Sequence, residues 1–170
     1  MRPIIVEGPD GSGKSTLVAK LSKDFNLPIH HPGGPPLNKD EFLSRLNFYS
    51  QNKDKFIFDR SPHISELIYP AATGRLGVIG KSVLYQLLGV LDPVIVYCRR
   101  KNMRDMWESI DRAKKAHKSP EHMAEVLSQF KNIVDGYDDL LDSAFKNVIR
   151  YDWAEKPYSE LLKEVKKCAG

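Results

Sequence analysis

Short apolar runs alternate along the chain with longer segments whose apolar residues recur at helical spacing. The runs predicted as strands are Arg2–Glu7, Leu27–His31, Lys55–Asp59, Pro93–Cys98 and Asn147–Tyr151. The segments predicted as helices are Gly13–Phe25, Lys39–Gln51, Gly80–Val90, Asn102–Ala116, Pro120–Phe145 and Tyr158–Lys167, and no regular element is assigned from Arg60 to Ile79. Because several strands are apolar throughout, the pattern is typical of parallel strands covered on both faces. It predicts a three-layer α/β fold with a mostly parallel, five-stranded sheet.

The length of 170 residues suits one domain, which we expect to span residues 1–170. Hydrophobic residues make up 41% and charged residues 28%, an ordinary globular balance. The two cysteines, Cys98 and Cys168, exclude a disulfide scaffold and favour a reducing compartment. We find no signal-peptide pattern and no apolar stretch of the roughly 20 residues that a membrane span needs. The expected location is the cytoplasm, with no membrane partner.

The charge balance points to phosphate-bearing partners. Lysine and arginine number 26 and aspartate and glutamate 22, which gives a net charge of +4. A modest positive excess suits either nucleotides or nucleic acid. It does not choose between them.

The strongest local signal is the segment Gly8–Ser15, which fits the pattern G-x-x-x-x-G-K-[ST] between a predicted strand and a predicted helix. Its glycines allow successive amides to point inward, and together with the helix N-terminus they form a phosphate site. Lys14 can reach the β- and γ-phosphates of a nucleoside triphosphate, and the Ser15 hydroxyl can ligate Mg²⁺. The residues predicted to bind ATP are Gly8, Asp10, Gly11, Ser12, Gly13, Lys14, Ser15 and Thr16.

A second signal is the pair Asp59-Arg60 at the end of a buried strand. Parallel sheets bind their ligands at this edge. Asp59 can hold Mg²⁺ directly or through water, and Arg60 can clamp the phosphate of an acceptor. The sequence therefore predicts Ser15 and Asp59 as metal ligands, and Lys14, Asp59 and Arg60 as catalytic residues.

Three segments in this order resemble the signatures of thymidylate kinases: Val6–Thr16, His31–Leu37 and Asp59-Arg60. Two further segments, Tyr69–Leu76 and Phe130–Leu140, are similar to later parts of that family. The resemblance implies transfer of the γ-phosphoryl group of ATP to a deoxynucleoside monophosphate, with dTMP as the favoured acceptor and Mg²⁺ as cofactor. It also implies a homodimer.

The resemblance assigns further roles. Asp10 matches the residue that contacts the acceptor's 3′-hydroxyl, while Arg60 and, approximately, Arg75 match arginines at the acceptor phosphate. A phosphate loop without arginine implies a cation in a lid, and the basic segment 112–118 lies where that lid belongs, with Arg112 as the chosen residue.

The acceptor-base region is shorter than in the family. Phe42 and Arg45 are the residues predicted to contact the acceptor there, and Phe48 and Tyr49 are further candidates on the same predicted helix. For the aromatic side chains a place in the core is at least as well supported. The sequence leaves open whether dTMP alone or several deoxynucleoside monophosphates are accepted.

Two other functions compete with this interpretation. The segment Phe56–Ala72 also resembles viral thymidine kinases, but a nucleoside kinase benefits from a carboxylate base after the second strand, where this chain has His30 and His31. A nucleotide-dependent nucleic-acid-binding protein would need a continuous basic stripe, whereas the cations here cluster beside the predicted phosphate site. Both comparisons favour a monophosphate kinase.

Overall fold

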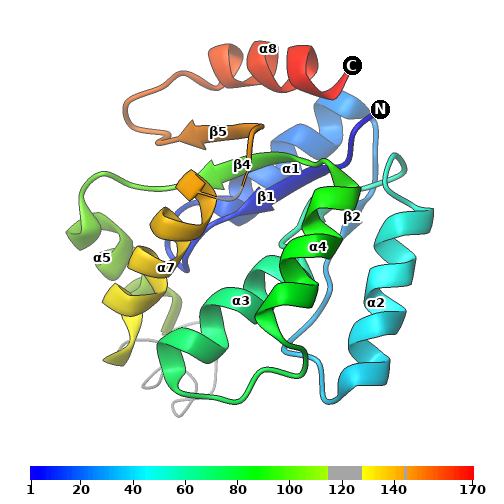
Figure 1. Cartoon of the computed structure of the whole chain (residues 1–170). Helices are drawn as coiled ribbons and strands as arrows, with labels where there is room; N and C mark the ends of the chain where they lie inside the picture. The colour runs from blue at the N-terminus through cyan, green and yellow to red at the C-terminus, as the bar shows by residue number, and fades with distance from the viewer. Residues whose placement is uncertain (115–127, 144) are drawn as a thin grey trace.

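The computed structural model describes residues 1–114, 128–143 and 145–170, with the side chains of 87–90 and 111–114 outside the description. Five strands are present: β1 (Ile4–Glu7), β2 (Ile29–His30), β3 (Ile57–Asp59), β4 (Val94–Cys98) and β5 (Val148–Tyr151). The described helices are α1 (Lys14–Phe25), α2 (Lys39–Gln51), α3 (Pro62–Thr73), α4 (Lys81–Leu91), α5 (Met103–Lys114), α7 (Phe130–Ser143) and α8 (Tyr158–Ala169), arranged as in Figure 1.

The strands form one sheet in the order β2-β3-β1-β4-β5, and all four pairings are parallel. This arrangement confirms the predicted α/β class and five-stranded parallel sheet. Since every strand runs the same way, the loops that follow all five strands lie at one edge of the sheet. Ligands of open α/β sheets bind at this edge.

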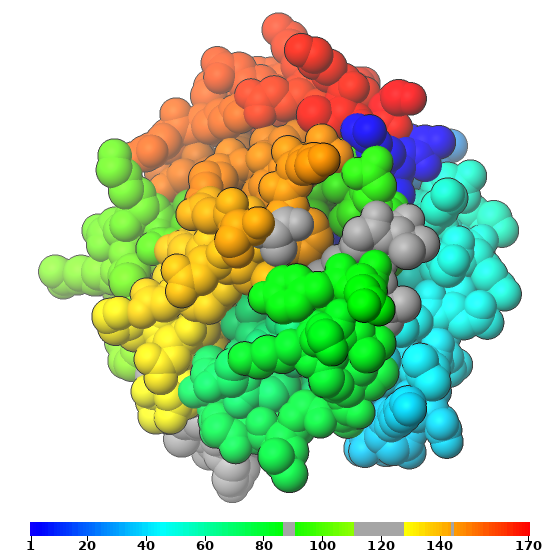
Figure 2. Space-filling view, in the orientation of Figure 1, coloured from blue at the N-terminus to red at the C-terminus, as the bar shows by residue number. Residues whose placement is uncertain are grey.

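Apolar side chains alternate along the strands and build a core on each face of the sheet. On one face, Ile4 and Val6 of β1 pack with residues of α1 and α8. On the other, Ile95 and Tyr97 of β4 pack with residues of α2, α3, α4 and α7. Figure 2 shows α2, α3, α4 and α7 side by side over this second face. The three predicted layers are thus present.

Helix α3 was not predicted, and its local sequence explains both its presence and the omission. The Ser61 hydroxyl accepts from the backbone N–H of His63, Pro62 occupies the first turn, and Gly74 ends the helix in the left-handed conformation. Pro70 lies inside the helix and has no N–H to donate. An interior proline argues against a helix in the sequence, but the starting cap and the buried apolar face stabilise one here.

The other predicted elements agree with the structure to within a few residues, with one exception. The helix predicted from Pro120 to Phe145 is described only as α7 (Phe130–Ser143), because residues 115–127 lie outside the described part. Among the described residues, no helix has the length and apolar character needed to cross a membrane.

Candidate active site

The phosphate loop joins β1 to α1 and packs closely against two other elements. Gly8 and Gly11 both have positive φ angles, and a Cβ atom on either would lie 2.3 Å from a backbone oxygen, that of Cys98 for Gly8 and that of Met106 for Gly11. Because Cys98 ends β4 and Met106 lies in α5, the loop is fixed between them. Only glycine fits at these two positions.

Two cavities meet at this loop. The first, the α8-side cavity, has a volume of about 700 Å³ and is lined by the phosphate loop, α1, α5 and the segment from Tyr151 to Tyr158. The second, the α3-side cavity, has a volume of about 560 Å³ and is lined by the segment His31–Pro36, the end of β3, α3 and Arg75. Asp10, Lys14 and Ser15 line both. The same three side chains therefore face both cavities.

Lys14 is folded back onto its own loop. Its Nζ donates to the carbonyl oxygen of Pro9 at 3.1 Å and lies 3.9 Å from Asp10 Oδ1. Burial, assisted by the nearby positive charge of Arg60, lowers the pKa of the Lys14 ammonium to about 8. Because Lys14 lines both cavities, an anion that enters either one would stabilise the protonated form of its ammonium group.

Arg60 lines the α3-side cavity and lies in the turn that follows β3. Its guanidinium donates to Asp10 Oδ1 at 2.6 Å and to the Tyr69 hydroxyl at 2.7 Å. Its backbone has φ of 73°, a left-handed conformation that is rare outside glycine. The geometry joins two predicted site residues, Asp10 and Arg60, that are 50 positions apart in the sequence.

Asp59 and Ser15 fit the predicted magnesium site by their chemistry. Asp59 Oδ2 lies 2.9 Å from His31 Nδ1, while Asp59 Oδ1 is buried and has no hydrogen-bond partner. A buried carboxylate oxygen and a hydroxyl are the hard donors that Mg²⁺ prefers. The described residues contain no group of three or more His, Cys, Asp or Glu side chains suited to a metal. Mg²⁺ needs no such group where substrate phosphates and water complete its ligands.

Two more arginines line the α3-side cavity, each beside a carboxylate. Arg45 donates to the carbonyl oxygen of Gly34 at 2.6 Å and pairs with Glu41, so it holds the segment that covers the cavity. Arg75 lies 3.2 Å from Glu66, a buried residue that also accepts from the backbone of Val78. All three arginines predicted to bind the acceptor, Arg45, Arg60 and Arg75, thus line this cavity.

Other predicted site residues are placed differently. Phe42 is fully buried in the core beneath α2, packed near His63, and does not line either cavity, so the predicted contact with an acceptor base is wrong. Gly8 and Ser12 belong to the phosphate loop but line neither cavity, whereas Gly11, Gly13 and Thr16 line the α8-side cavity. The backbone of Arg112 belongs to α5, but its side chain, like the lid segment from 115 onward, lies outside the described residues.

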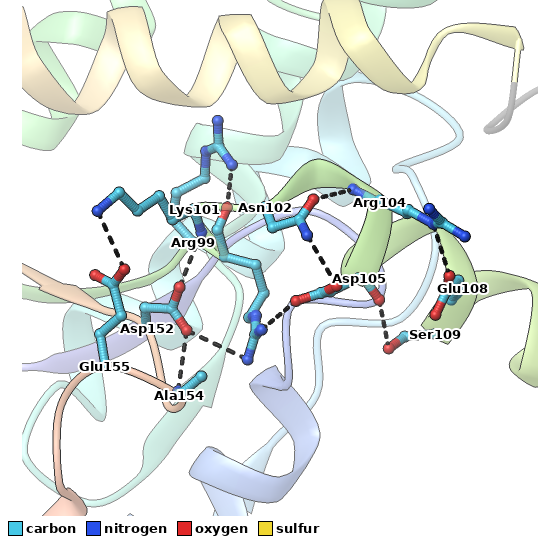
Figure 3. Close-up of polar contacts among 11 residues, drawn as sticks. Arg99, Lys101, Asn102, Arg104, Asp105, Glu108, Ser109, Asp152, Ala154 and Glu155 are labelled. Atoms are coloured by element: carbon cyan, nitrogen blue, oxygen red, sulfur yellow. Dashed lines mark hydrogen bonds and ion pairs between the residues drawn. The ribbon is translucent and has the colours of Figure 1, made fainter.

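The α8-side cavity has an aromatic wall. Trp153 is 56% exposed, and the guanidinium of Arg100 lies 4.1 Å from its ring centroid. Figure 3 shows how the loops after β4 and β5 are joined: Asp152 accepts from the backbone N–H of Lys101, whose side chain pairs with Glu155. The loops after β4 and β5 are therefore joined at the tryptophan, whose exposed ring lines the α8-side cavity beside Gly13 of the phosphate loop.

The sequence patterns missed several residues of this site. Glu7 is completely buried, and it accepts from the Ser61 N–H at 2.6 Å and from the Tyr137 hydroxyl at 3.1 Å. Burial raises the pKa of the Glu7 carboxyl to about 7. An acid ending an apolar strand was the available signal. Tyr69 and Glu66 were missed because α3 was not predicted.

Comparison with known proteins supports the fold and part of the sequence resemblance. No family model matches the chain. A thymidylate kinase from Sulfurimonas denitrificans is 37% identical over 73 residues, a match that covers 39% of this chain and only 38% of that protein.

Two solved structures superpose over nearly the whole chain. The YorR protein of Bacillus subtilis, in complex with phosphorylated GDP, gives a TM-score of 0.73 at 20% identity, over 98% of this chain and 94% of that chain. Deoxyadenosine kinase from M. mycoides with bound dATP gives 0.60 at 18% identity, over 99% of this chain and 100% of that chain. At such identity these matches show the fold. The chain therefore has the α/β fold of P-loop kinases, and a segment of its sequence is similar to a thymidylate kinase.

Proposed function

We propose that this protein transfers the γ-phosphoryl group of ATP to a deoxynucleoside monophosphate, with dTMP as the favoured acceptor. The observation that carries the proposal is the meeting of two cavities at Asp10, Lys14 and Ser15. Two nucleotides bound on either side of the phosphate loop would bring a donor and an acceptor phosphate to the same side chains. Such positioning is the main requirement of phosphoryl transfer.

The α8-side cavity is assigned to ATP. It combines the N-terminus of α1, which suits phosphate groups, with the exposed ring of Trp153. An exposed aromatic ring is a suitable surface for stacking a purine. Lys20 and Lys156 also line this cavity and add positive charge for a polyphosphate.

The α3-side cavity is assigned to the acceptor. Arg45, Arg60 and Arg75 all line it, which favours an anionic acceptor over a neutral nucleoside. Since the acceptor phosphate is itself an adequate nucleophile, the reaction needs no general base. The sequence signatures and the partial identity to a thymidylate kinase favour dTMP among the monophosphates.

The side chains divide the work of charge neutralisation. Lys14 would contact the β- and γ-phosphates of ATP, and Arg60, held by Asp10 and Tyr69, would face the acceptor phosphate. Ser15 and Asp59 would hold Mg²⁺, which when bound supplies positive charge to the phosphate oxygens. Arg60 must leave Asp10, at least in part, to bind phosphate, so Asp10 becomes available to the acceptor's sugar. A cytoplasmic location and a homodimer stay predictions from the sequence.

The two assignments are tested together by steady-state kinetics with ATP, Mg²⁺ and dTMP. Trp153→Ala is expected to raise the KM for ATP roughly 10-fold, the value of about one stacking contact, with little change in the KM for dTMP. Arg75→Gln is expected to raise the KM for dTMP and leave that for ATP nearly unchanged. Trp107→Ala and Arg104→Gln, at exposed positions on α5 that line neither cavity, are the matched controls. The opposite pattern of KM changes would show that the donor and acceptor cavities are exchanged.

A further inference from the structure

Glu7 is the last residue of β1 and immediately precedes the phosphate loop, yet its carboxylate points away from both cavities. It is completely buried and lines neither. Oε1 accepts from the backbone N–H of Ser61 at 2.6 Å, and Oε2 accepts from the Tyr137 hydroxyl at 3.1 Å. A buried carboxylate is costly, so its retention here needs a reason beyond packing.

The Ser61 amide belongs to the turn that presents Arg60. This turn is held at three points: Arg60 N–H donates to the Val6 carbonyl at 3.0 Å, the Tyr49 hydroxyl donates to the Arg60 carbonyl, and Ser61 N–H donates to Glu7. A left-handed non-glycine residue is unfavourable by itself and persists only where its surroundings fix it. The bond to Glu7 is the one of the three in which a side chain is the acceptor.

The same turn positions two groups of the site. Asp59 precedes it, and Arg60 projects from it toward Asp10 and Tyr69. If Ser61 N–H lost its acceptor, the turn could relax toward an ordinary conformation, and the Arg60 guanidinium would move away from the cavity. The contact of Arg60 with Asp10 alone would not prevent this movement. In the proposed reaction the acceptor phosphate takes the place of Asp10 as the partner of Arg60.

We propose that Glu7 is a positioning residue for acceptor binding: its hydrogen bond to Ser61 fixes the left-handed Arg60 turn, and thereby aims Arg60 at the acceptor phosphate. Tyr137 in α7 supports the carboxylate from the opposite side. This inference rests on the proposed function, since it names the part that Glu7 plays in that reaction.

Two near-isosteric substitutions separate the hydrogen bond from the charge. Glu7→Gln keeps an acceptor for Ser61 N–H, and its amide can donate to the Tyr137 oxygen. Glu7→Met fills the same space without an acceptor of comparable strength. We expect Glu7→Met to lower kcat/KM for dTMP roughly 10- to 100-fold, the cost of leaving a buried N–H donor without an acceptor, while the KM for ATP changes little. Glu7→Gln is expected to stay within about threefold of the wild type on the same scale.

The matched control lies in the adjacent aromatic pair. Tyr97 and Tyr137 stack with centroids 5.8 Å apart, but the Tyr97 hydroxyl donates to Asp138 instead of Glu7. Tyr137→Phe should raise the KM for dTMP by a smaller factor than Glu7→Met, and Tyr97→Phe should leave it unchanged. Equal losses in Glu7→Gln and Glu7→Met would overturn the proposal, because the charge and not the hydrogen bond would then be responsible. Full activity of Glu7→Met would overturn it as well.

A second readout does not depend on activity. Hydrogen exchange of the Ser61 amide, followed by NMR without nucleotide, should be faster in Glu7→Met than in the wild type and near the wild-type rate in Glu7→Gln. If Glu7→Met does not fold, the exchange and kinetics of Glu7→Gln decide: protection and activity near the wild type support the proposal, and loss of both overturns it. Normal exchange behaviour in a protein that phosphorylates no monophosphate would instead contradict the proposed function alone.

Discussion

At the scale of single residues, burial sets the charge of the groups around the phosphate loop. Lys14 and Glu7 lie at the two ends of this loop. Burial lowers the pKa of Lys14 and raises the pKa of Glu7, so in both cases it favours the neutral form. The two shifts have different consequences. For Lys14 the neutral form binds phosphate poorly, whereas for Glu7 the charged form carries a cost in folding.

The pH dependence of ATP binding tests the role of Lys14. In the free protein the pKa of Lys14 is about 8, so the side chain loses its proton as pH rises through this value. Polyphosphate beside the ammonium raises that pKa again, so ATP binding takes up a proton near pH 8.5 and weakens at higher pH. Calorimetry in two buffers of different ionisation enthalpy measures this uptake. Lys14→Met should bind ATP more weakly and take up no proton; a wild type that takes up none at pH 8.5 would contradict the assignment.

The stability of Glu7→Gln as a function of pH tests the burial of the carboxylate. The pKa of Glu7 is raised from 4.5 to about 7, so the folded state binds more protons than the unfolded state between these values. The contribution of Glu7 to stability therefore falls as pH rises through this window and is constant above it. Between pH 5 and pH 8, Glu7→Gln should gain roughly 2 to 3 kcal/mol relative to the wild type.

Urea unfolding at the two pH values gives the comparison. Glu160→Gln, at an exposed position in α8, serves as the control and should show a difference from the wild type that changes little with pH. A pH-independent difference for Glu7→Gln would mean that Glu7 is not buried as described.

At the scale of elements, the site depends on close packing between the phosphate loop and its neighbours. Gly8 shows this most directly, because the Cys98 oxygen at the end of β4 leaves no room for a Cβ atom and φ is 142°. Backbone cannot yield as a flexible side chain can. The loop is consequently a rigid part of the fold.

Gly8→Ala should lower the free energy of unfolding by roughly 2 to 5 kcal/mol, from backbone strain and overpacking together. Gly80→Ala is the control, since Gly80 has a negative φ and no atom within 4 Å of an added Cβ. It should cost less than about 1 kcal/mol. Denaturant titration measures both, and equal costs would show that the packing of Gly8 is not special.

The elements also show what the sequence could and could not predict. The buried strands and the phosphate loop were predictable, because apolar runs and the glycine pattern are local signals. Phe42, Leu46 and Tyr49 recur at helical spacing and all are buried, so the same rule could have placed Phe42 in the core. The turn of Arg60 and the bond of Arg45 to Gly34 depend on contacts between distant segments, which no local pattern contains.

At the scale of the whole molecule, the parallel sheet brings the loops of five strands to one edge, where two cavities share the phosphate loop. The wall of the α3-side cavity combines the segment after β2, the turn after β3 and helix α3. Under the proposed function, acceptor preference would depend on three separate parts of the chain, whereas the phosphate-loop pattern lies in one. This is why the phosphate loop could be predicted from the sequence, whereas the full lining of the α3-side cavity could not.

The central claim is tested most directly by measuring ADP formation from ATP and Mg²⁺ with separate acceptors: dTMP, the other common deoxynucleoside and ribonucleoside monophosphates, and thymidine. The account predicts ADP and an equal amount of dTDP with dTMP, lower rates with the other monophosphates, no product with thymidine, and loss of activity in Lys14→Met. Product from thymidine but not from dTMP would make the protein a nucleoside kinase. ADP released at the same rate with no acceptor, or none with any acceptor, would contradict the proposed reaction itself.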